Sequence, residues 1–162
     1  MESKITILDG AMGTMLQKAG LKPGEHPEVF GYNNPNIVID IHKKYIEAGS
    51  DIVYTNTFGA NSHKLSGCEL SVDEAVKSAV HCAKEAVKES GVRVALDVGP
   101  IGELLEPLGT LAFEEAYEVY KELMIAGEKY GVDLIVCETF TDLYDVKAAV
   151  LAAKENTKLP IW

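Results

Sequence analysis

The chain has 162 residues, enough for one ordinary domain with a buried core, and its 47% hydrophobic and 25% charged residues are typical of globular proteins. Its formal net charge of −10 argues against nucleic acids and anionic membrane surfaces as partners. No apolar run approaches the roughly 18 residues of a membrane span, and no signal peptide precedes the first strand-like run, so we expect a cytoplasmic protein.

Short strand-like runs alternate with longer helical runs along the chain. In chain order, the predicted elements are a strand at 5–8, a helix from 34 to 49, a strand at 52–54, a helix at 71–90, a strand at 92–96, a helix around 117–124, a strand at 134–136, a helix from about 142 to 155, and the start of a strand at 159–162. Pro35 opens the first of these helices and Gly49 ends it. Ser71 and Glu74 can form a capping box, and Gly91 supplies a stop. The alternation predicts a parallel sheet covered by helices.

An internal repeat strengthens this prediction. The pattern G-x-D-[IL]-[VI]-x-x-x-T-F begins at Gly49 and again at Gly131, 82 residues later, which corresponds to two strand–helix units of roughly 40 residues each. Recurrence at every second strand favours a parallel (β/α)8 TIM-type barrel. A doubly wound open sheet stays open as an alternative, although its G-x-G-x-x-G motif is absent.

A short polar or acidic residue stands where each of the first four predicted strands ends. These residues are Asp9, Asn56, Asp97 and Glu138. The carboxyl ends of barrel strands surround the active site, so four such positions favour a shared site over four separate helix N-caps. Acidic side chains would bind an ammonium group, and the small loop after Asp9 would present the N–H groups of Gly10 and Ala11 to a carboxylate. The residues themselves therefore predict a pocket for a zwitterion.

Four sequence blocks carry a resemblance to a known family. They are D-G-A-M-G-T from Asp9, T-N-T-F-G-A-N from Thr55, D-V-G-P followed by Gly102-Glu103 from Asp97, and E-T-F from Glu138. Together they resemble the homocysteine S-methyltransferase family, that is, the homocysteine-binding barrel of cobalamin-dependent methionine synthase and its relatives that use betaine or S-methylmethionine. The resemblance covers essentially the whole chain.

The resemblance implies a chemistry and a cofactor. In this family the barrel binds homocysteine, and a zinc ion holds its sulfur as a thiolate that attacks a methyl donor to give methionine. Cobalamin is the methyl carrier on another module in some members. The donor itself, whether methylcobalamin, betaine or S-methylmethionine, stays open.

The resemblance also implies a set of substrate-binding residues. They are Asp9, Gly10, Thr55, Asn56, Asp97 and Glu138. Glu138 and the region of Asp9 would bind the ammonium group, and Gly10 and Thr55 would lie near the carboxylate. The other two would line or support the pocket, and no catalytic residue is expected in the chain.

The cysteines and histidines predict no metal site in the chain. The zinc ligands of the family are cysteines in G-x-N-C and G-G-C-C motifs on later strands, and the chain has neither motif. Cys68, Cys82 and Cys137 form no C-x-x-C pair and leave an odd thiol, which favours a reducing compartment. We interpret Cys137 as a buried strand cysteine. No two histidines are four residues apart, and His81 and Cys82 would diverge by about 100° on a helix.

About 250 residues are typical of a whole barrel, so we expect the chain to form the amino-terminal half of one, with about four strand–helix units and the start of a fifth strand. Two hypotheses stay open. The chain is part of a zinc-dependent methyltransferase whose complete polypeptide does the chemistry, or it is a non-catalytic half-barrel that self-associates or docks a complementary half. Alone, we expect weak homocysteine binding and no catalysis. The expected inward-facing residues are Ile5, Ile7, Ile52, Val94, Leu96 and Leu134, or their alternates.

Overall fold

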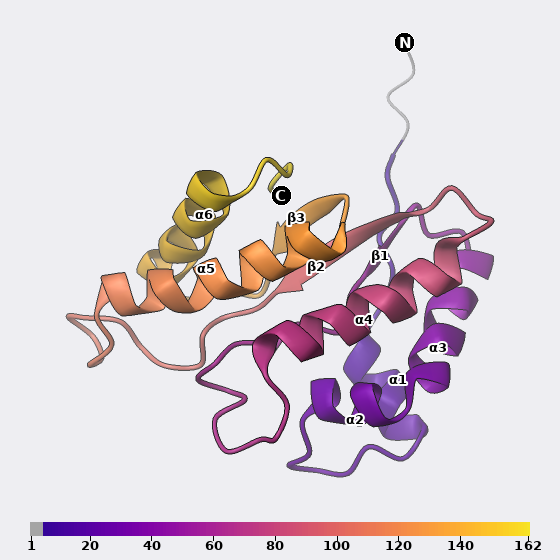
Figure 1. Cartoon of the computed structure of the whole chain (residues 1–162), viewed down its shortest axis with the longest axis horizontal. Coiled ribbons are helices and arrows are strands. Elements are labelled where there is room, and N and C mark those ends of the chain that lie inside the picture. The colour runs from indigo at the N-terminus through magenta and orange to yellow at the C-terminus, as the bar shows by residue number, and fades with distance from the viewer. Residues whose placement is uncertain (1–4) are drawn as a thin grey trace.

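The computed structural model describes residues 5–162, and in that range the chain forms three strands and six helices (Figure 1). In chain order these are α1 (Met12–Lys18), α2 (Pro27–Asn33), α3 (Pro35–Glu47), β1 (Ile52–Tyr54), α4 (Val72–Val87), β2 (Arg93–Val98), α5 (Phe113–Tyr130), β3 (Leu134–Cys137) and α6 (Leu143–Asn156). The predicted alternation of strands and helices from residue 52 onward is confirmed. Across these residues, no helix has the length and apolar character needed to cross a membrane.

The three strands form one parallel sheet in the order β1-β2-β3. The two outer runs predicted as strands lie beside this sheet, but each forms only a single parallel bridge, Leu8 with Ile52 and Ile161 with Ile135. The prediction of a strand over 5–8 was therefore wrong in extent. β2 runs two residues beyond its predicted end because Asp97 and Val98 still pair with β3.

The predicted boundaries of α3, α4 and α6 are confirmed to within a few residues, because capping residues mark them locally, whereas α5 spans Phe113–Tyr130 and is longer than the predicted helix around 117–124. Ser71 and Glu74 form the capping box of α4, with Ser71 Oγ accepting a hydrogen bond from Glu74 N at 3.3 Å. Pro35 is the first residue of α3, as predicted. Gly131, which was not predicted as a helix end, terminates α5 in the left-handed conformation with φ 84°. The helices α1 and α2 were missed, since seven residues make only about two turns and show little periodicity.

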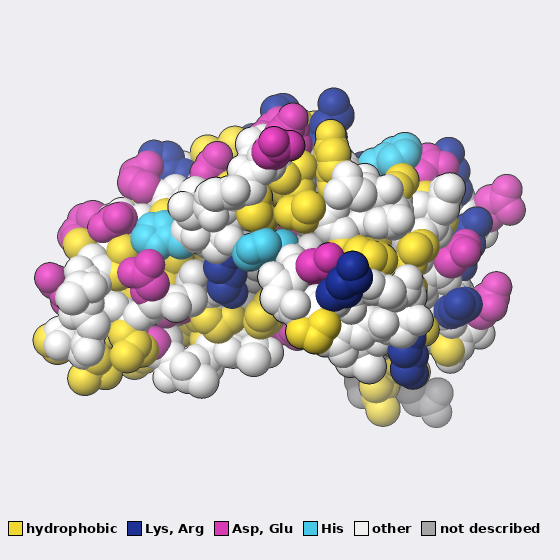
Figure 2. Space-filling model, turned by 90° about the horizontal axis from the view of Figure 1, so that it is seen from below, with side chains coloured by type: hydrophobic (Ala, Val, Ile, Leu, Met, Phe, Trp, Pro, Cys, Tyr) yellow, Lys and Arg dark blue, Asp and Glu magenta, His cyan; other side chains and the backbone are white. Residues whose placement is uncertain are grey.

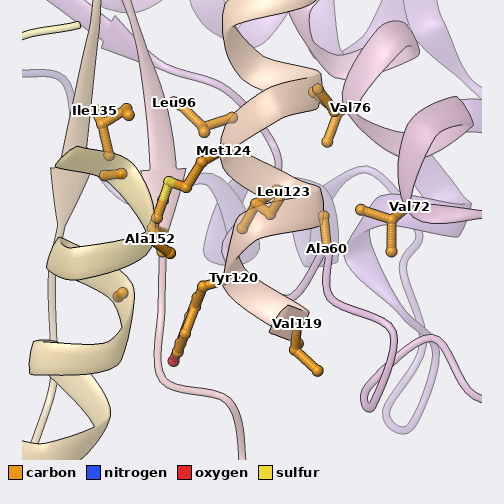
Figure 3. Close-up of a cluster of buried hydrophobic side chains, with 14 of the residues drawn as sticks. Ala60, Val72, Val76, Leu96, Val119, Tyr120, Leu123, Met124, Ile135 and Ala152 are labelled. Carbon is orange, nitrogen blue, oxygen red and sulfur yellow. The ribbon is translucent and has the colours of Figure 1, made fainter. Parts of the chain in front are cut away.

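One face of the sheet is covered by α4, α5 and α6. Figure 3 shows Leu123 and Met124 of α5 near Leu96 of β2, with Val76 of α4 to one side and Ala152 of α6 to the other. All five side chains are at most 2% exposed. Burial of this apolar surface is the main source of stability for a sheet that has helices on this face.

The opposite face of the sheet carries a separate apolar cluster made only of strand residues. Its members are Ile52, Ala95, Leu134 and Val136, with Tyr54 packed against them. The expectation that Ile52 and Leu134 face inward agrees with this cluster. The expectation was wrong for Val94 and Leu96, which pack with the helices, because successive strand side chains point to opposite faces. Ile5 is 81% exposed and belongs to neither cluster.

Candidate functional site

A pocket of about 680 Å³ opens where the three strands end at their carboxyl termini. Thr55 and Asn56 follow β1, Asp97 is the penultimate residue of β2, and Glu138 follows β3, and all four line the pocket. Met12, Gly13 and Thr14 of α1 and Pro27 and Glu28 of α2 contribute further lining. In Figure 2, acidic, basic and histidine side chains are interspersed with hydrophobic ones, so the net charge of −10 is not gathered into one patch on that face.

Asp97 is a buried acid at the wall of the pocket. Its Oδ1 atom has no hydrogen-bond partner among the described residues. The pKa of Asp97 is raised to about 8, mainly by burial and also by the negative charges of Glu138, Asp9 and Glu28, while the charge of Lys64 acts in the opposite direction. A cation in the pocket would relieve both the missing hydrogen bond and the repulsion between the acids.

Asp9 lies close to these acids, but it is not among the residues that line the pocket. Its side chain is 2% exposed, and its Oδ2 atom accepts a hydrogen bond from Tyr54 N at 3.1 Å. Oδ1 has no partner among the described residues. Burial raises the pKa of Asp9 to about 7 against the lowering effect of the backbone hydrogen bonds, and the charge of Glu138 also raises it. Asp9 therefore influences the pocket through its negative charge, which raises the pKa of Asp97, and not as a lining residue.

A fully buried histidine, His42 of α3, accompanies Asp9. Its Nδ1 atom lies 4.0 Å from Asp9 Oδ2, and neither ring nitrogen has a hydrogen-bond partner among the described residues. Burial lowers the pKa of His42 to about 4, so the imidazole is neutral at pH 7 and does not neutralise Asp9. The sequence showed His42 only as a histidine inside an apolar helical pattern, which carried no sign of this contact.

The ends of β1 and β2 are held together by threonine hydroxyl groups. Thr55 Oγ1 lies 2.7 Å from Thr57 Oγ1, which donates a hydrogen bond to the carbonyl oxygen of Asp97 at 2.7 Å. The Asp97 N–H in turn donates to Thr55 Oγ1 at 3.2 Å. Asn56 is also engaged, since its Nδ2 atom donates to the carbonyl oxygen of Pro27 at 2.8 Å and so ties α2 to the pocket. These bonds fix the positions of the polar side chains before any ligand arrives.

Gly10 makes room for an aromatic ring. A Cβ atom at Gly10 would lie 2.7 Å from Tyr45 Cε1, and the Tyr45 hydroxyl donates a hydrogen bond to the carbonyl oxygen of Ala11 at 3.1 Å. Gly10 is not among the residues that line the pocket, whereas Ala11 is. The absence of a side chain at Gly10 thus lets the backbone lie close to the Tyr45 ring. A role for Gly10 in carboxylate binding stays a prediction.

The chain turns sharply after Glu138. The Glu138 N–H continues the sheet by donating to the carbonyl oxygen of Val98 at 3.0 Å. The next residue, Thr139, has φ 61°, a left-handed conformation that is costly for a β-branched side chain. Strained backbone conformations are often found at functional sites. Here the strained residue directly follows Glu138, and both residues line the pocket.

The described residues do not fit a zinc site. Among residues 5–162, no group of three or more His, Cys, Asp and Glu side chains is placed to hold a metal ion. Cys137, the cysteine beside Glu138, packs against the helix-covered core, and burial, helped by the charge of Asp97, raises the pKa of its thiol to about 11. A protonated thiol is a poor metal ligand.

Among the pocket or near-pocket residues that sequence patterns did not indicate are Lys64, Glu28 and His42. Glu28 is buried and its Oε1 atom accepts a hydrogen bond from Gly59 N at 2.7 Å. Lys64 lines the pocket from the loop between β1 and α4. The available signal was weak, because Lys64 lies in a loop and Glu28 in a helix of only seven residues, while the helical pattern around His42 gave no sign of its contact with Asp9.

Comparison with known proteins agrees with this architecture. The family described as Homocysteine S-methyltransferase matches residues 6–162. The methionine synthases of Mycobacterium tuberculosis and Mycobacterium leprae are 32% and 31% identical to this chain over 167 residues, which is 95% of this chain and 14% of each of those proteins. The chain therefore spans about one seventh of the length of these relatives.

The solved structures of the homocysteine methyltransferase MmuM from Escherichia coli share the fold. The oxidized form has a TM-score of 0.86 at 22% identity, and the metallated form has 0.84 at 21%. Each comparison covers 99% of this chain and 62% of the MmuM chain. Since the family match extends over nearly all of its residues, the chain belongs to the homocysteine S-methyltransferase family.

Proposed function

We propose that this chain forms the homocysteine-binding part of a homocysteine S-methyltransferase, in which a methyl group passes to the homocysteine thiol and gives methionine. Family membership supports this proposal. The observation that carries it is the pair of buried carboxyl oxygens without hydrogen-bond partners, Asp9 Oδ1 and Asp97 Oδ1, near a pocket that Glu138 also lines. A substrate ammonium would supply hydrogen-bond donors and a positive charge to these unpartnered carboxyl oxygens.

The chain contributes binding rather than thiol activation. When the ammonium enters, its charge lowers the pKa values of Asp97 and Asp9 again, so that the acids meet the substrate as carboxylates. The zinc ion that would hold the thiolate, and any module that carries cobalamin, belong to other residues, because no described group fits a metal ion.

We further propose that the sheet is part of a (β/α)8 barrel whose remaining strands come from the same polypeptide or from a second chain. The parallel order of the strands and the single bridges at Leu8 and Ile161, one on each side of the sheet, support this arrangement. The strand-only cluster on the face without helices supports it too, because an inward barrel face is filled by strand side chains alone.

A second candidate is a half-barrel without catalytic activity that associates with itself or with a complementary half. The exposed edges favour it, since Ile7 is 54% and Trp162 is 50% exposed at opposite sides of the sheet. An active methyltransferase assembled from the natural polypeptide would exclude this candidate, whereas a stable oligomer without activity would support it.

A cytoplasmic location forms part of the same proposal. The three cysteines are all free thiols, which suits a reducing compartment.

Glu138→Gln tests the proposal in the natural polypeptide that carries this chain, at its full length. Loss of the carboxylate charge removes a charge-assisted hydrogen bond to the ammonium, so the dissociation constant for homocysteine should rise roughly ten- to hundredfold in calorimetry. Glu89→Gln, at an exposed position between α4 and β2, is the matched control and should leave the constant unchanged. Equal affinity of the Glu138→Gln variant and the wild type would remove Glu138 from the site.

A further inference from the structure

His42 is a polar side chain at a position where an apolar one would cost less to bury. It lies in the second half of α3 and is fully buried. In the part of the chain that the structure describes, neither of its ring nitrogens has a hydrogen-bond partner. A neutral imidazole carries one N–H donor and one acceptor nitrogen, and burying both without partners costs free energy. The surroundings of His42 must therefore account for its presence.

The group that His42 faces is the carboxyl group of Asp9. The His42 Nδ1 atom lies 4.0 Å from Asp9 Oδ2, and the two side chains are 0% and 2% exposed. A direct N–H···O hydrogen bond needs about 2.7–3.2 Å, so the two atoms are roughly 1 Å too far apart. The pair is placed so that a small movement would complete the bond.

β1 holds Asp9 from the side opposite to α3. The Asp9 N–H donates a hydrogen bond to the carbonyl oxygen of Ile52 at 3.1 Å, and Asp9 Oδ2 accepts one from the Tyr54 N–H at 3.1 Å. A carboxylate oxygen can accept two hydrogen bonds, so Oδ2 can bind His42 as well. The backbone of Asp9 is thus fixed, and its side chain lies between the strand and the helix.

α3 also holds the segment that follows Asp9. Tyr45 lies three residues after His42 and so on the same face of the helix. Its hydroxyl group donates a hydrogen bond to the carbonyl oxygen of Ala11 at 3.1 Å. The two side chains therefore address the same short segment, Tyr45 through its backbone and His42 through the carboxyl group of Asp9.

The protonation state of Asp9 decides how strongly the two side chains attract each other. The pKa of Asp9 is raised to about 7, mainly by burial, so near neutral pH many molecules hold a proton on this group. Burial lowers the pKa of His42 to about 4, so the ring stays neutral. A hydrogen bond to an ionised acceptor is roughly twice as strong as one to a neutral acceptor. A cation that favours the carboxylate form of Asp9 therefore also favours the approach of the ring.

We propose that His42 is a positioning residue for Asp9, whose ring donates its Nδ1–H to Asp9 Oδ2 when a substrate ammonium enters the pocket. The bond fixes the carboxylate whose negative charge attracts the ammonium. His42 keeps its own proton, and a proton held by Asp9 passes to the solvent. This assignment rests on the proposed function, because the ammonium belongs to the same substrate.

The test compares three variants in the natural polypeptide that carries this chain, at its full length. The amide of His42→Asn can take the place of Nδ1, whereas the longer side chain of His42→Gln reaches the place of Nε2, and His42→Leu has no donor. Calorimetry should show about tenfold weaker homocysteine binding for His42→Leu and His42→Gln, and affinity close to the wild type for His42→Asn. His81→Asn, at an exposed position of α4, is the control and should change nothing.

Thermal unfolding shows which variants are folded at the temperature of the calorimetry. Equal weakening in all three folded variants would mean that the ring only fills space, and it would overturn the assignment. Wild-type affinity in His42→Leu would overturn it too, and so would a rescue by His42→Gln but not by His42→Asn.

A measurement on the wild type keeps the assignment testable even if the variants do not fold. In a crystal structure of its homocysteine complex, His42 Nδ1 and Asp9 Oδ2 should lie about 2.7–3.2 Å apart. A pair that stays about 4 Å apart would overturn the assignment. A wild type that does not bind homocysteine would overturn the proposed function as well, whereas normal binding that Glu138→Gln weakens and His42→Leu does not would overturn this assignment alone.

Discussion

At the residue scale, the protonation of Asp97 predicts how stability depends on pH. Its pKa rises from 3.8 to about 8 on folding, mainly because of burial, so the folded state holds a proton that the unfolded state has lost across this range. Stability therefore falls as pH rises from about 4 to 8, by an amount on the order of a few kcal/mol. Asp9, with a pKa of about 7, acts in the same direction.

Urea unfolding of the wild type and of Asp97→Asn, at pH values from 5 to 8.5, measures this effect. The wild type should lose stability over the range, and the variant should show a clearly smaller slope because asparagine does not titrate. Parallel curves for the two proteins would show that Asp97 ionises normally. Under the proposed function, homocysteine should reduce the slope of the wild type, because the substrate ammonium would stabilise the carboxylate form of Asp97.

At the scale of elements, the packing of α5 on β2 depends on Gly127. A Cβ atom there would lie 2.6 Å from Leu96 Cδ2, and Leu96 is fully buried. Alanine gains up to about 1 kcal/mol of helix propensity over glycine, but overpacking a closed core costs about 1–3 kcal/mol. We therefore expect Gly127→Ala to lower the free energy of unfolding by about 1–2 kcal/mol in urea titrations.

Gly13 of α1 is the matched control, because a Cβ atom there would meet no atom within 4 Å. Gly13→Ala should be neutral or should stabilise the protein by up to about 1 kcal/mol. If Gly127→Ala were as stable as the wild type, the contact between α5 and β2 would be looser than the structure shows.

At the scale of the whole molecule, the 162-residue chain on its own should bind no stoichiometric zinc. The reason is the absence, among residues 5–162, of a side-chain group that fits a metal ion, together with the protonated thiol of Cys137. Metal analysis after dialysis against micromolar zinc checks this. One tightly held zinc per chain that disappears in Cys137→Ala would contradict it.

The same chain should also associate when it is expressed alone. Its sheet has exposed apolar edges at Ile7 and Trp162, and edge strands with apolar surface favour pairing. Sedimentation equilibrium at low micromolar concentration should show a dimer or a larger species, or loose packing in near-ultraviolet circular dichroism. A compact, well-packed monomer would show that the open face of the sheet needs no partner.

The sequence by itself was sufficient for the elements whose signals are local. Strands at 52–54 and 134–136 follow from short apolar runs, and the start of α4 follows from Ser71 and Glu74, because capping and periodicity depend on residues a few positions apart. It also placed polar residues at the carboxyl ends of the strands, since parallel strands bring those ends to one edge. The family could be named because four short motifs recur in a fixed order.

Only the tertiary structure decided which of these residues meet at the pocket. It put Asp9 out of the lining beside His42, turned Gly10 toward Tyr45, and brought Lys64 among the acids from a loop without periodicity. It also decided which strand residues face the helices. Such choices depend on contacts between segments tens of residues apart, and on the burial that shifts the pKa values of the acids, so they have no signature in any short stretch of sequence.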